Sequence, residues 1–595
     1  MEERSLPAVR SVIPLDSPAD NTSTFHTLYD ALQSSGLAAG DIVQIEAGSS
    51  PGMLFNSWIP NKSNLTIQGN PSVPLTELPS IGFANAITIT SAQAGFTFQH
   101  IGLRLQDNTL TFQGDGTLRD VYAESRVVGV PIQLDGTIAA NIINSHIAAF
   151  SGGTIVQPLI QVNTAPGAHN LIQGNLFDNL DSNSQTPLIA YSGANSISDV
   201  IEQNTLLCNS GPILVNTGVD GLTIQDNDIT GGGFNTGVNV AAGAKNVAIR
   251  RNSIENFTTG ITVDAGTSGT TTSVTIANNR ITAGAAGEGI AFNGTTGALA
   301  ATVEGNELFN NQVGVLINFP GSGIDLGGGA ASKGGNNFRG FMTTATPSAG
   351  AIIVNAVAAS AIDARLNLFG VVDPETVIFD GNDNNTHGDI VAANKLTGNA
   401  AYVQALFQQF LRRTGDLNDP NDAGKWVAQL NKKVSRHAVV QGISHLPEAL
   451  GLVVDDLYRS LLHESPTPAQ RTALIQQMAD GVTSTTLARQ LFASPEYSNQ
   501  FVSPEAYVQS VYLKLLGRLP TDDELNSQLK KSRTAIAQKI LGSKEYRDLK
   551  IRELIGTVLH RVAVDAEVTK LVKLDQSLDA IRGKLAESSE FFDFG

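Results

Sequence analysis

Charged residues gather beside a recurring asparagine in the middle of the chain, and they are the best candidates for chemistry. Asp226 and Arg251 each precede one of these asparagines, Asp228 and Arg280 each follow one, and Arg250 adjoins Arg251. Arginine converging with carboxylates on one stripe could bind an acidic group or transfer a proton. The same charges could instead form exposed ion pairs between strands, each worth about 0–1 kcal/mol.

The asparagines belong to a short repeat that reads apolar, any, apolar, two residues, Asn, any, apolar. It occurs at Asn175, Asn204, Asn227, Asn252, Asn279 and Asn306, and subtraction gives steps of 29, 23, 25, 27 and 27 residues. A period in this range indicates a solenoid. Inside each unit apolar and polar residues alternate, which indicates strands rather than helices.

Stacking explains how such a repeat becomes stable. One coil of about 25 residues cannot bury its own apolar face, whereas stacked coils bury a continuous core. Parallel strands then pair from coil to coil at about 4.8 Å, and inward asparagines can hydrogen-bond to one another as a ladder. The same stacking brings Asp226 beside Arg251, and Arg280 beside Glu307. We therefore interpret the asparagines as structural.

This pattern resembles the right-handed parallel β-helix repeat proteins of the pectate-lyase-like superfamily over roughly the first two-thirds of the chain. The resemblance implies a mainly β solenoid, a right-handed single-stranded parallel β-helix. Polysaccharide lyases on this fold use an Arg or Lys base, together with a cation held by carboxylates. The resemblance is specific for the fold and not for an activity, because function lies in sites built onto a fold.

Charge and glycine content divide the chain near residue 395. Residues 1–395 hold 14 Lys+Arg and 32 Asp+Glu, a balance of −18, whereas residues 396–595 hold 24 and 23, a balance of +1. We predict an N-terminal segment with a capping helix over 1–45, a right-handed parallel β-helix over 46–395 and an all-α domain of four repeats over 396–595. The acidic segment argues against a nucleic-acid partner, because phosphate binding needs clustered Lys and Arg.

The first of these parts contains a short amphipathic pattern. Phe25, Leu28, Tyr29 and Leu32 share one face of a helix expected over Thr24–Ser34. A solenoid exposes the edge of its first coil, and a helix placed there prevents edge-to-edge pairing. We therefore expect this helix to be the N-terminal cap.

A polar run near the end of the predicted β-helix is a candidate calcium site. Asp380, Asn382, Asp383 and Asp389 supply oxygen atoms at spacings similar to those of a calcium loop. However, Asn385 stands where such a loop needs Gly, and Val391 where it needs a bidentate Glu. A polar terminal turn is the alternative, since Asn and Asp commonly form turns. Calcium is the one cofactor that these residues suggest.

From Asn399 the apolar period becomes helical, and four units follow. Each opens on an apolar helix ending in Arg, at Arg413, Arg518 and Arg561, with Glu464 in the second unit. Each closes on a Glu, and three of the four closings read Ser-x-Glu; the glutamates are Glu448, Glu496, Glu545 and Glu590. A Ser N-cap and an Arg–carboxylate ion pair explain the pattern. The units resemble a bacterial surface-protein family of unknown function whose helical unit is similar to that of phycobilisome linker polypeptides.

These features predict an extracellular or cell-envelope protein with a structural, adhesive or carbohydrate-binding role, in which the helical part serves attachment. Its expected partners are a polysaccharide or envelope and surface proteins. A polysaccharide lyase or glycoside hydrolase acting on the β-helix face is the alternative, so enzyme activity is left open. The chain has no apolar run long enough for a transmembrane helix. No leader is visible, although Glu2–Ala8 resembles an element near the front of bacterial surface proteins.

Overall fold

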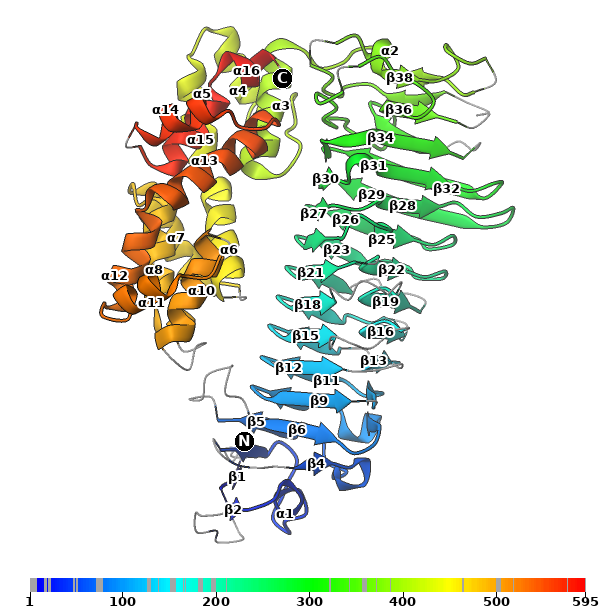
Figure 1. The fold of residues 1–595 in the computed structure, drawn as a ribbon. Coiled ribbons are helices and arrows are strands. Elements are labelled where there is room, and N and C mark those ends of the chain that lie inside the picture. Colours follow the sequence, from blue (N-terminus) through cyan, green and yellow to red (C-terminus); the bar gives the residue numbers. More distant parts are fainter. Residues whose placement is uncertain are drawn as a thin grey trace.

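The computed structural model contains a parallel β-solenoid of about 11 coils, followed by a region of helices (Figure 1). Most coils contribute one strand to each of three sheets, which we call A, B and C in chain order and which hold 16, 11 and 12 strands. The fold class predicted for the first two-thirds of the chain is confirmed. The description covers residues 8–14, 19, 23–46, 49, 52–70, 79–106, 108–125, 130–136, 139–149, 157–163, 165, 167–179, 186–193, 199–209, 211–319, 323–341, 343–355, 361–370, 372–385, 387–462, 465–498, 504–516, 518–574 and 576–593. Glu464 and most of the Glu2–Ala8 element lie outside it.

Sheet A precedes the asparagine in each coil. Its strands, in spatial order, are β2 (Thr24–Phe25), β1 (Val9–Val12), β3 (Ile42–Ile45), β5 (Thr66–Gly69), β8 (Phe96–Gln99), β11 (Gly116–Arg119), β14 (Asn141–Ile143), β17 (Leu171–Gln173), β20 (Val200–Glu202), β23 (Thr223–Gln225), β26 (Val247–Arg250), β29 (Thr271–Ala277), β32 (Ala298–Glu304), β35 (Ile324–Gly327), β37 (Ile362–Ala364) and β39 (Ile390–Val391).

Sheet B follows the asparagine. Its strands are β4 (Met53–Leu54), β6 (Ser80–Phe83), β9 (Gly102–Gln106), β12 (Tyr122–Ser125), β15 (His146–Ala149), β18 (Leu176–Asn179), β21 (Thr205–Cys208), β24 (Asp228–Thr230), β27 (Ser253–Glu255), β30 (Arg280–Thr282) and β33 (Glu307–Leu308).

Sheet C completes each coil. Its strands are β7 (Ile87–Ile89), β10 (Leu110–Phe112), β13 (Ile132–Asp135), β16 (Ile160–Asn163), β19 (Ile189–Ser192), β22 (Ile213–Val215), β25 (Thr236–Val240), β28 (Thr259–Asp264), β31 (Gly284–Asn293), β34 (Asn311–Asn318), β36 (Gly350–Val354) and β38 (Ile378–Phe379).

The helices lie mainly after the last strand. They are α1 (Leu28–Leu32), α2 (Pro374–Val377), α3 (Gly398–Leu411), α4 (Ala423–Asn431), α5 (Arg436–Ser444), α6 (Pro447–Leu462), α7 (Pro468–Ala479), α8 (Ser484–Phe492), α9 (Pro495–Ser498), α10 (Pro504–Leu516), α11 (Asp522–Gln528), α12 (Arg533–Leu541), α13 (Lys544–Leu559), α14 (Asp565–Val572), α15 (Leu578–Ala586) and α16 (Ser589–Asp593), with short 3-10 turns at Asn56–Trp58 and Ser91–Gln93.

The predicted asparagine ladder is present and fully buried between sheets A and B. In Asn252, Nδ2 donates to Asn279 Oδ1 at 2.9 Å and to the Ile224 carbonyl at 3.0 Å, and Oδ1 accepts from the backbone N and Nδ2 of Asn227. Buried amides are thereby satisfied from coil to coil. The ladder also continues further than predicted, because Asn306 bonds to Asn336, and Asn336 to Asn367. The stack of coils therefore extends beyond the six repeats found in the sequence.

The residue before each ladder asparagine adopts the left-handed conformation, with φ of 55° at Asp226, 53° at Arg251 and 58° at Asn278. Side chains other than glycine rarely occupy this region. Here it turns the chain sharply from sheet A into sheet B. The turn holds the side chains of Asp226 and Arg251 at a corner of the solenoid.

The N-terminal helix is shorter than predicted. Helix α1 has five residues, and its Leu28, Ala31 and Leu32 are buried. Phe25 lies in strand β2 instead, and Tyr29 is 45% exposed. The expected apolar face is thus formed only in part, because the chain joins sheet A through β1 and β2 before the helix begins.

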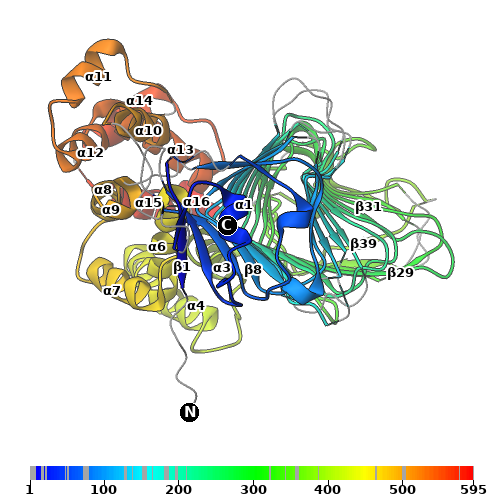
Figure 2. The same ribbon diagram turned by 90° about the horizontal axis from the view of Figure 1, so that it is seen from below.

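The helical region folds back along the solenoid and lies against one side of it (Figures 1 and 2). Gln408 donates to the Gly335 carbonyl, and Thr414 donates to Asn278 at 3.3 Å. The ring of His560 stacks on Phe309 with centroids 3.5 Å apart. The helical region therefore covers part of sheet B.

The helical region has two apolar cores. One gathers α3, α4 and α5 with α14, α15 and α16, and the other gathers α6 to α12, while α13 contributes to both. The last helix thus packs on the first, and the Tyr402 hydroxyl donates to the Ala586 carbonyl at 2.9 Å. None of the described helices is long and apolar enough to cross a membrane.

The predicted Ser caps and arginine ion pairs are present in the helical units. Ser543 caps α13 by accepting from the Tyr546 backbone N at 3.1 Å. Arg518 pairs with Glu545 at 2.6 Å and with Glu524 at 2.8 Å. Equivalent arginines make the same double pairs: Arg413 with Asp422 and Glu448, and Arg561 with Glu567 and Glu590. Each arginine joins the start of a unit to the end of the same unit.

Candidate functional site

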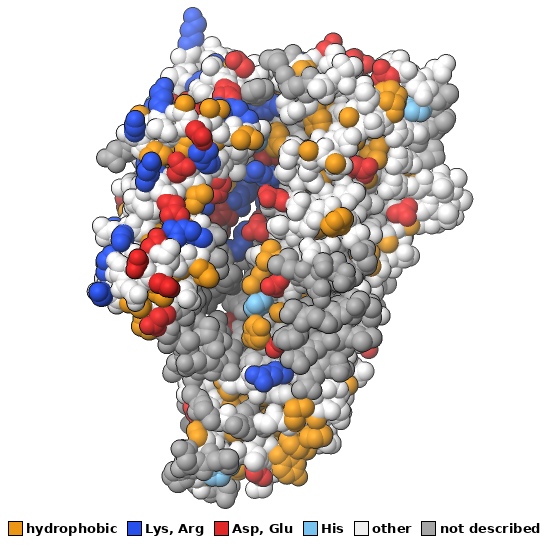
Figure 3. Space-filling view, viewed as in Figure 1, with side chains coloured by type: hydrophobic (Ala, Val, Ile, Leu, Met, Phe, Trp, Pro, Cys, Tyr) orange, Lys and Arg blue, Asp and Glu red, His pale blue; other side chains and the backbone are white. Residues whose placement is uncertain are grey.

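A charged groove lies between sheet B and the folded-back helices, where acidic and basic side chains gather along the seam (Figure 3). The groove has a volume of about 560 Å³. Its solenoid wall comes from β24, β27, β30, β33 and the turns before them, and its helical wall from α3, α6, α8, α13 and α15. The charged residues that line it are six basic ones, Arg251, Arg280, Arg412, Arg459, Lys550 and Arg582, and five acidic ones, Asp228, Glu307, Asp456, Glu553 and Asp579.

Three of the five site residues predicted from the sequence line this groove: Asp228, Arg251 and Arg280. Asp226 lies beside them and binds Arg251. Arg250 does not take part, because it ends β26 on sheet A and its side chain is exposed outside the groove. Arg251, by contrast, lies in the left-handed turn after β26, which holds its side chain at the corner of the solenoid.

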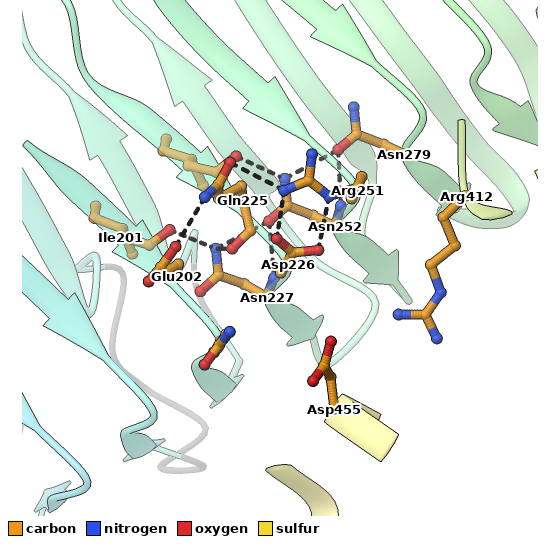
Figure 4. A network of polar contacts seen from close by, with 12 residues as sticks. Ile201, Glu202, Gln225, Asp226, Asn227, Arg251, Asn252, Asn279, Arg412 and Asp455 are labelled. Carbon is orange, nitrogen blue, oxygen red and sulfur yellow. Dashed lines mark hydrogen bonds and ion pairs between the residues drawn. The ribbon is translucent and has the colours of Figure 1, made fainter. Parts of the chain in front are cut away.

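Arg251 and Asp226 form a two-pronged ion pair between successive coils (Figure 4). Arg251 Nη2 lies 2.6 Å from Asp226 Oδ2, and its Nε lies 2.9 Å from Oδ1. Arg251 Nη2 also donates to Gln225 Oε1 at 3.1 Å, and Gln225 donates to Glu202 at 2.8 Å. The sequence predicted that stacking would bring Asp226 beside Arg251, and this prediction is confirmed. It holds Arg251 in place at the edge of the groove.

The helical wall carries its own ion pairs. Arg412 binds Asp456 through both ends of its guanidinium, and Arg459 lies 3.7 Å from the same carboxylate. Lys550 pairs with Glu553 at 2.7 Å. Asp579 accepts hydrogen bonds from Ser484, from the backbone N at 2.9 Å and the hydroxyl at 2.6 Å. These contacts fix the wall and neutralise most of its charge.

Two groove arginines lack such a partner. Neither Arg280 nor Arg582 forms an ion pair with a carboxylate of the described residues, and Arg280 Nε is buried without a hydrogen-bond acceptor. Arg582 donates only to the Gln409 carbonyl among the described residues, and its guanidinium lies 4.5 Å from the centroid of the Phe410 ring, which compensates the charge less than a carboxylate would. Burial lowers the pKa of Arg582 to about 10, because the charged form loses its hydration. Both cations are therefore under-compensated.

Two groove carboxyl groups have raised pKa values. Burial raises the pKa of Glu307 above 4.5, although the charges of Arg280, Arg339, Arg582 and Arg412 oppose the shift. The side chain of Asp228 is accessible to solvent but lies between sheet B and the helices. Its pKa is also raised, mainly by desolvation, although the charge of Arg459 opposes the shift. Arg280 and Glu307 stand directly opposite each other in the register of β30 and β33, as predicted. They do not, however, form a direct ion pair.

The predicted calcium residues lie at the closing turn of the solenoid. Asp380 is buried, and its two carboxylate oxygens accept from the backbone N of Asn382 at 2.9 Å and of Ile390 at 2.7 Å. Asp383 accepts from the Asp380 backbone N at 3.3 Å. No three His, Cys, Asp or Glu side chains among the described residues are grouped to hold a metal ion. The oxygens thus fit a polar turn, and calcium stays a prediction.

Sequence reasoning missed the helical half of the groove. Arg412, Asp456 and Arg582 come from three different helices, and nothing in their local patterns separates them from ordinary surface charges. Only the fold-back brings them to sheet B. One signal was available for the ladder, since Asn336 and Asn367 stand in the sequences GNNF and LNLF, which match the end of the repeat, Asn, any, apolar.

A comparison with family models agrees with the strand pairing. Residues 129–338 match the model described as a right handed beta helix region. This part of the chain is a right-handed β-helix. A second model, described as a domain of unknown function (DUF4214), matches residues 392–453, which hold the first helical unit. No curated protein matches the chain.

Several solved structures are similar to this β-helix protein. An alginate lyase from Paenibacillus sp. str. FPU-7 is 15% identical, with a TM-score of 0.27, and the match covers 50% of this chain and 94% of that one. The periplasmic alginate epimerase AlgG is 10% identical, with a TM-score of 0.29 and coverages of 63% and 84%. A PL6 family polysaccharide lyase from Pseudopedobacter saltans is 13% identical, with a TM-score of 0.29 and coverages of 62% and 91%.

Proposed function

We propose that this β-helix protein is a carbohydrate-binding protein that holds an acidic polysaccharide in the groove between sheet B and the helical region. The observation that carries the proposal is the pair of under-compensated cations, Arg280 and Arg582, inside a concave, charged cavity. A desolvated guanidinium is costly until a carboxylate reaches it. The carboxylate groups of uronic acids offer that partner with matching two-pronged geometry.

The other groove residues suit a hydroxylated ligand. Asp228, Ser253, Asn278 and Ser460 line the same cavity and can donate to or accept from sugar hydroxyls. Neutral sugars alone would leave Arg280 and Arg582 without compensation. The groove therefore favours a chain that alternates hydroxyl groups with carboxylates.

The protein acts without turnover in this proposal, and a catalytic role is the second candidate. One observation favours catalysis: Glu307 has a raised pKa and stands opposite Arg280, so an acid and a base candidate meet in one cavity. A lyase or a hydrolase would use such a pair. The same raised pKa also follows from packing the helices onto sheet B, which needs no chemistry.

We place the protein outside the cell or at the cell envelope, with the helical region as its attachment surface. Leu519 and Val562 support this role, because they follow Arg518 and Arg561 at equivalent positions and are 59% and 91% exposed. A partner that covered these two side chains would remove apolar surface from water, which favours association. Envelope or surface proteins are the expected partners, and Val562→Ser should weaken capture of the full-length protein by isolated cell envelopes.

Calorimetric titration with polyuronate and neutral oligosaccharides tests the proposed binding. Loss of one charge-assisted hydrogen bond should make Arg280→Gln bind polyuronate about tenfold or more weakly. Arg250→Gln is the matched control, since Arg250 lies outside the groove, and it should bind as the parent does. Equal binding of neutral chains, or equal losses in both variants, would overturn the proposal. Release of unsaturated products or new reducing ends by the parent, but not by Glu307→Gln, would establish the catalytic candidate.

A further inference from the structure

Sheet B carries a second group of polar and aromatic side chains, beyond the groove toward the N-terminal end. Tyr122 on β12 is 41% exposed and meets the ring of His146 on β15 edge-on, with centroids 5.0 Å apart. Both residues face outward. In Figure 1, β9 and β12 lie past the end of the helical region. The exposed ring of Tyr122 gives this part of sheet B an apolar surface that a ligand could cover.

This group belongs to the same column of side chains as the groove. The register of sheet B places Tyr122 opposite His146, then Leu176, Thr205, Asp228, Ser253, Arg280 and Glu307 in successive coils. Strands β12 and β30 are six steps apart in this sheet. At about 4.8 Å for each step, Tyr122 and Arg280 lie roughly 30 Å apart along one straight line.

The chemistry around Tyr122 suits a sugar ring. The phenol presents an apolar face with a polar tip, and such faces pack against the C–H side of a pyranose. Glu124 and Asp178 occupy the next outward positions on β12 and β18, where their carboxylates can accept from hydroxyl groups. Arg104, exposed on β9 opposite Glu124, can bind a carboxylate. The Nε2 atom of His146 is buried without a partner in the described chain.

We propose that Tyr122, His146 and Arg104 form a second subsite, which binds another stretch of the polysaccharide chain held in the groove. This inference rests on the proposed function and specifies its ligand: an extended acidic polysaccharide that runs along the solenoid axis and is bound at two places roughly 30 Å apart. Occupation of both places makes the second binding step intramolecular, so affinity must rise steeply once the oligosaccharide is long enough.

The test measures affinity against oligosaccharide length, using a size-fractionated polyuronate series. The parent should show a sharp gain in affinity once the oligomers exceed about 30 Å. Tyr122→Ala should remove that gain, a loss of about tenfold or more for long oligomers, while short oligomers bind the groove unchanged. Tyr122→Phe should keep the gain, because it retains the ring. Tyr29→Ala is the matched control, since Tyr29 is similarly exposed but belongs to α1 and packs on Trp58.

The outcomes separate the two proposals. If Arg280→Gln weakens binding at every length but Tyr122→Ala matches the parent for long oligomers, the second subsite is overturned and the groove stands. If Arg280→Gln has no effect while Tyr122→Ala weakens binding at every length, the sugar is bound at Tyr122 without the groove. Both the groove proposal and the binding of one chain at two places are then overturned. Absence of binding to any polyuronate by the parent overturns both.

Discussion

The imidazole of His560 lies flat against the ring of Phe309, with an interplanar angle of 12°. His560 ends helix α13 in the left-handed conformation, and Phe309 directly follows strand β33, so this stack ties the helical region to the solenoid. Neither ring nitrogen of His560 has a hydrogen-bond partner among the described residues. Burial, together with the charges of Arg339 and Arg280, holds the pKa of His560 well below 6.5.

This stack makes stability depend on pH. The folded protein keeps His560 neutral, whereas the unfolded chain takes up a proton as pH falls below 6.5. The unfolded state then binds more protons, so the free energy of unfolding falls by up to about 1.4 kcal/mol for each pH unit below 6.5 and is unaffected above it. His560→Phe keeps the stack and should remove this slope in urea unfolding measured between about pH 5 and 7.5.

His445→Phe is the control for that experiment, because His445 is exposed on the same helical region. It should leave the slope unchanged. Protonation of Glu307 acts in the opposite direction, since its raised pKa stabilises the folded state as pH falls, but it is common to all three proteins and cancels in the differences. A slope that persists in His560→Phe would show that other groups cause it.

The asparagine ladder should dominate the stability of the solenoid. Asn252→Ala removes two donated and two accepted hydrogen bonds and leaves the buried Asn227 backbone N without its acceptor. Unsatisfied buried groups cost about 1–3 kcal/mol each, so we expect a loss of about 3 kcal/mol or more in chemical unfolding. Asn239→Ala, on the outward face of β25, should cost less than about 0.5 kcal/mol. Similar losses at both positions would contradict the structural role of the ladder.

Leu366 offers a stabilising change. It precedes the ladder residue Asn367 with a φ of 58°, a conformation that leucine adopts at a cost, and its side chain is 37% exposed. Asparagine tolerates this conformation, so Leu366→Asn should raise the free energy of unfolding by up to about 1 kcal/mol. Leu519→Asn, at an exposed position without a positive φ, should give no gain. A loss of stability in Leu366→Asn would mean that the apolar contacts of Leu366 outweigh the strain.

The arginine of each helical unit should contribute modestly. Arg518 holds Glu524 and Glu545 with two-pronged contacts and lowers the pKa of Glu524 to about 2. All three side chains are about a third exposed or more, so solvent screens them, and Arg518→Lys should cost no more than about 1 kcal/mol at neutral pH. The depressed pKa means that this contribution is complete above pH 4.5 and is lost as pH falls toward 2.

The control for that change is Arg489→Lys, because Arg489 forms no ion pair with a described residue. Thermal unfolding of both variants at low and at high salt checks the assignment. Only the Arg518→Lys difference should shrink as salt increases, since screening weakens ion pairs near the surface. A difference that is independent of salt would point to lost packing on Tyr512, whose ring lies under the Arg518 guanidinium.

The solenoid could be predicted from its sequence because its contacts repeat. Every coil places the same residue types at the same positions, so Asn227 and Asn252 reveal the environment of Asn279 without any coordinates. The Arg251–Asp226 pair follows from the same rule. Leu366 and Arg412 do not follow this rule. Leu366 is not the residue type expected at its turn, and Arg412 reaches the groove only through long-range packing.

The groove could not be predicted as a whole, since its two walls are separated by more than a hundred residues. Arg280 belongs to a repeat and was identified, but its counterpart Arg582 sits in an amphipathic helix like many others. Nothing in the pattern of α15 states which surface it will face. The fold-back depends on single contacts such as Gln408 with Gly335 and His560 with Phe309, and such contacts have no periodicity.

The uniform rise of the coils has a consequence for how such a molecule can diversify. Each coil is a structural unit, so duplication or loss of the coil of β21, which lies between the two sites, would move Tyr122 relative to Arg280 by a single increment of about 4.8 Å and would keep the residues of both sites. The number of coils between the two sites thus sets the distance between them. Selection could then adjust the length of polymer that is recognised without redesigning a single contact.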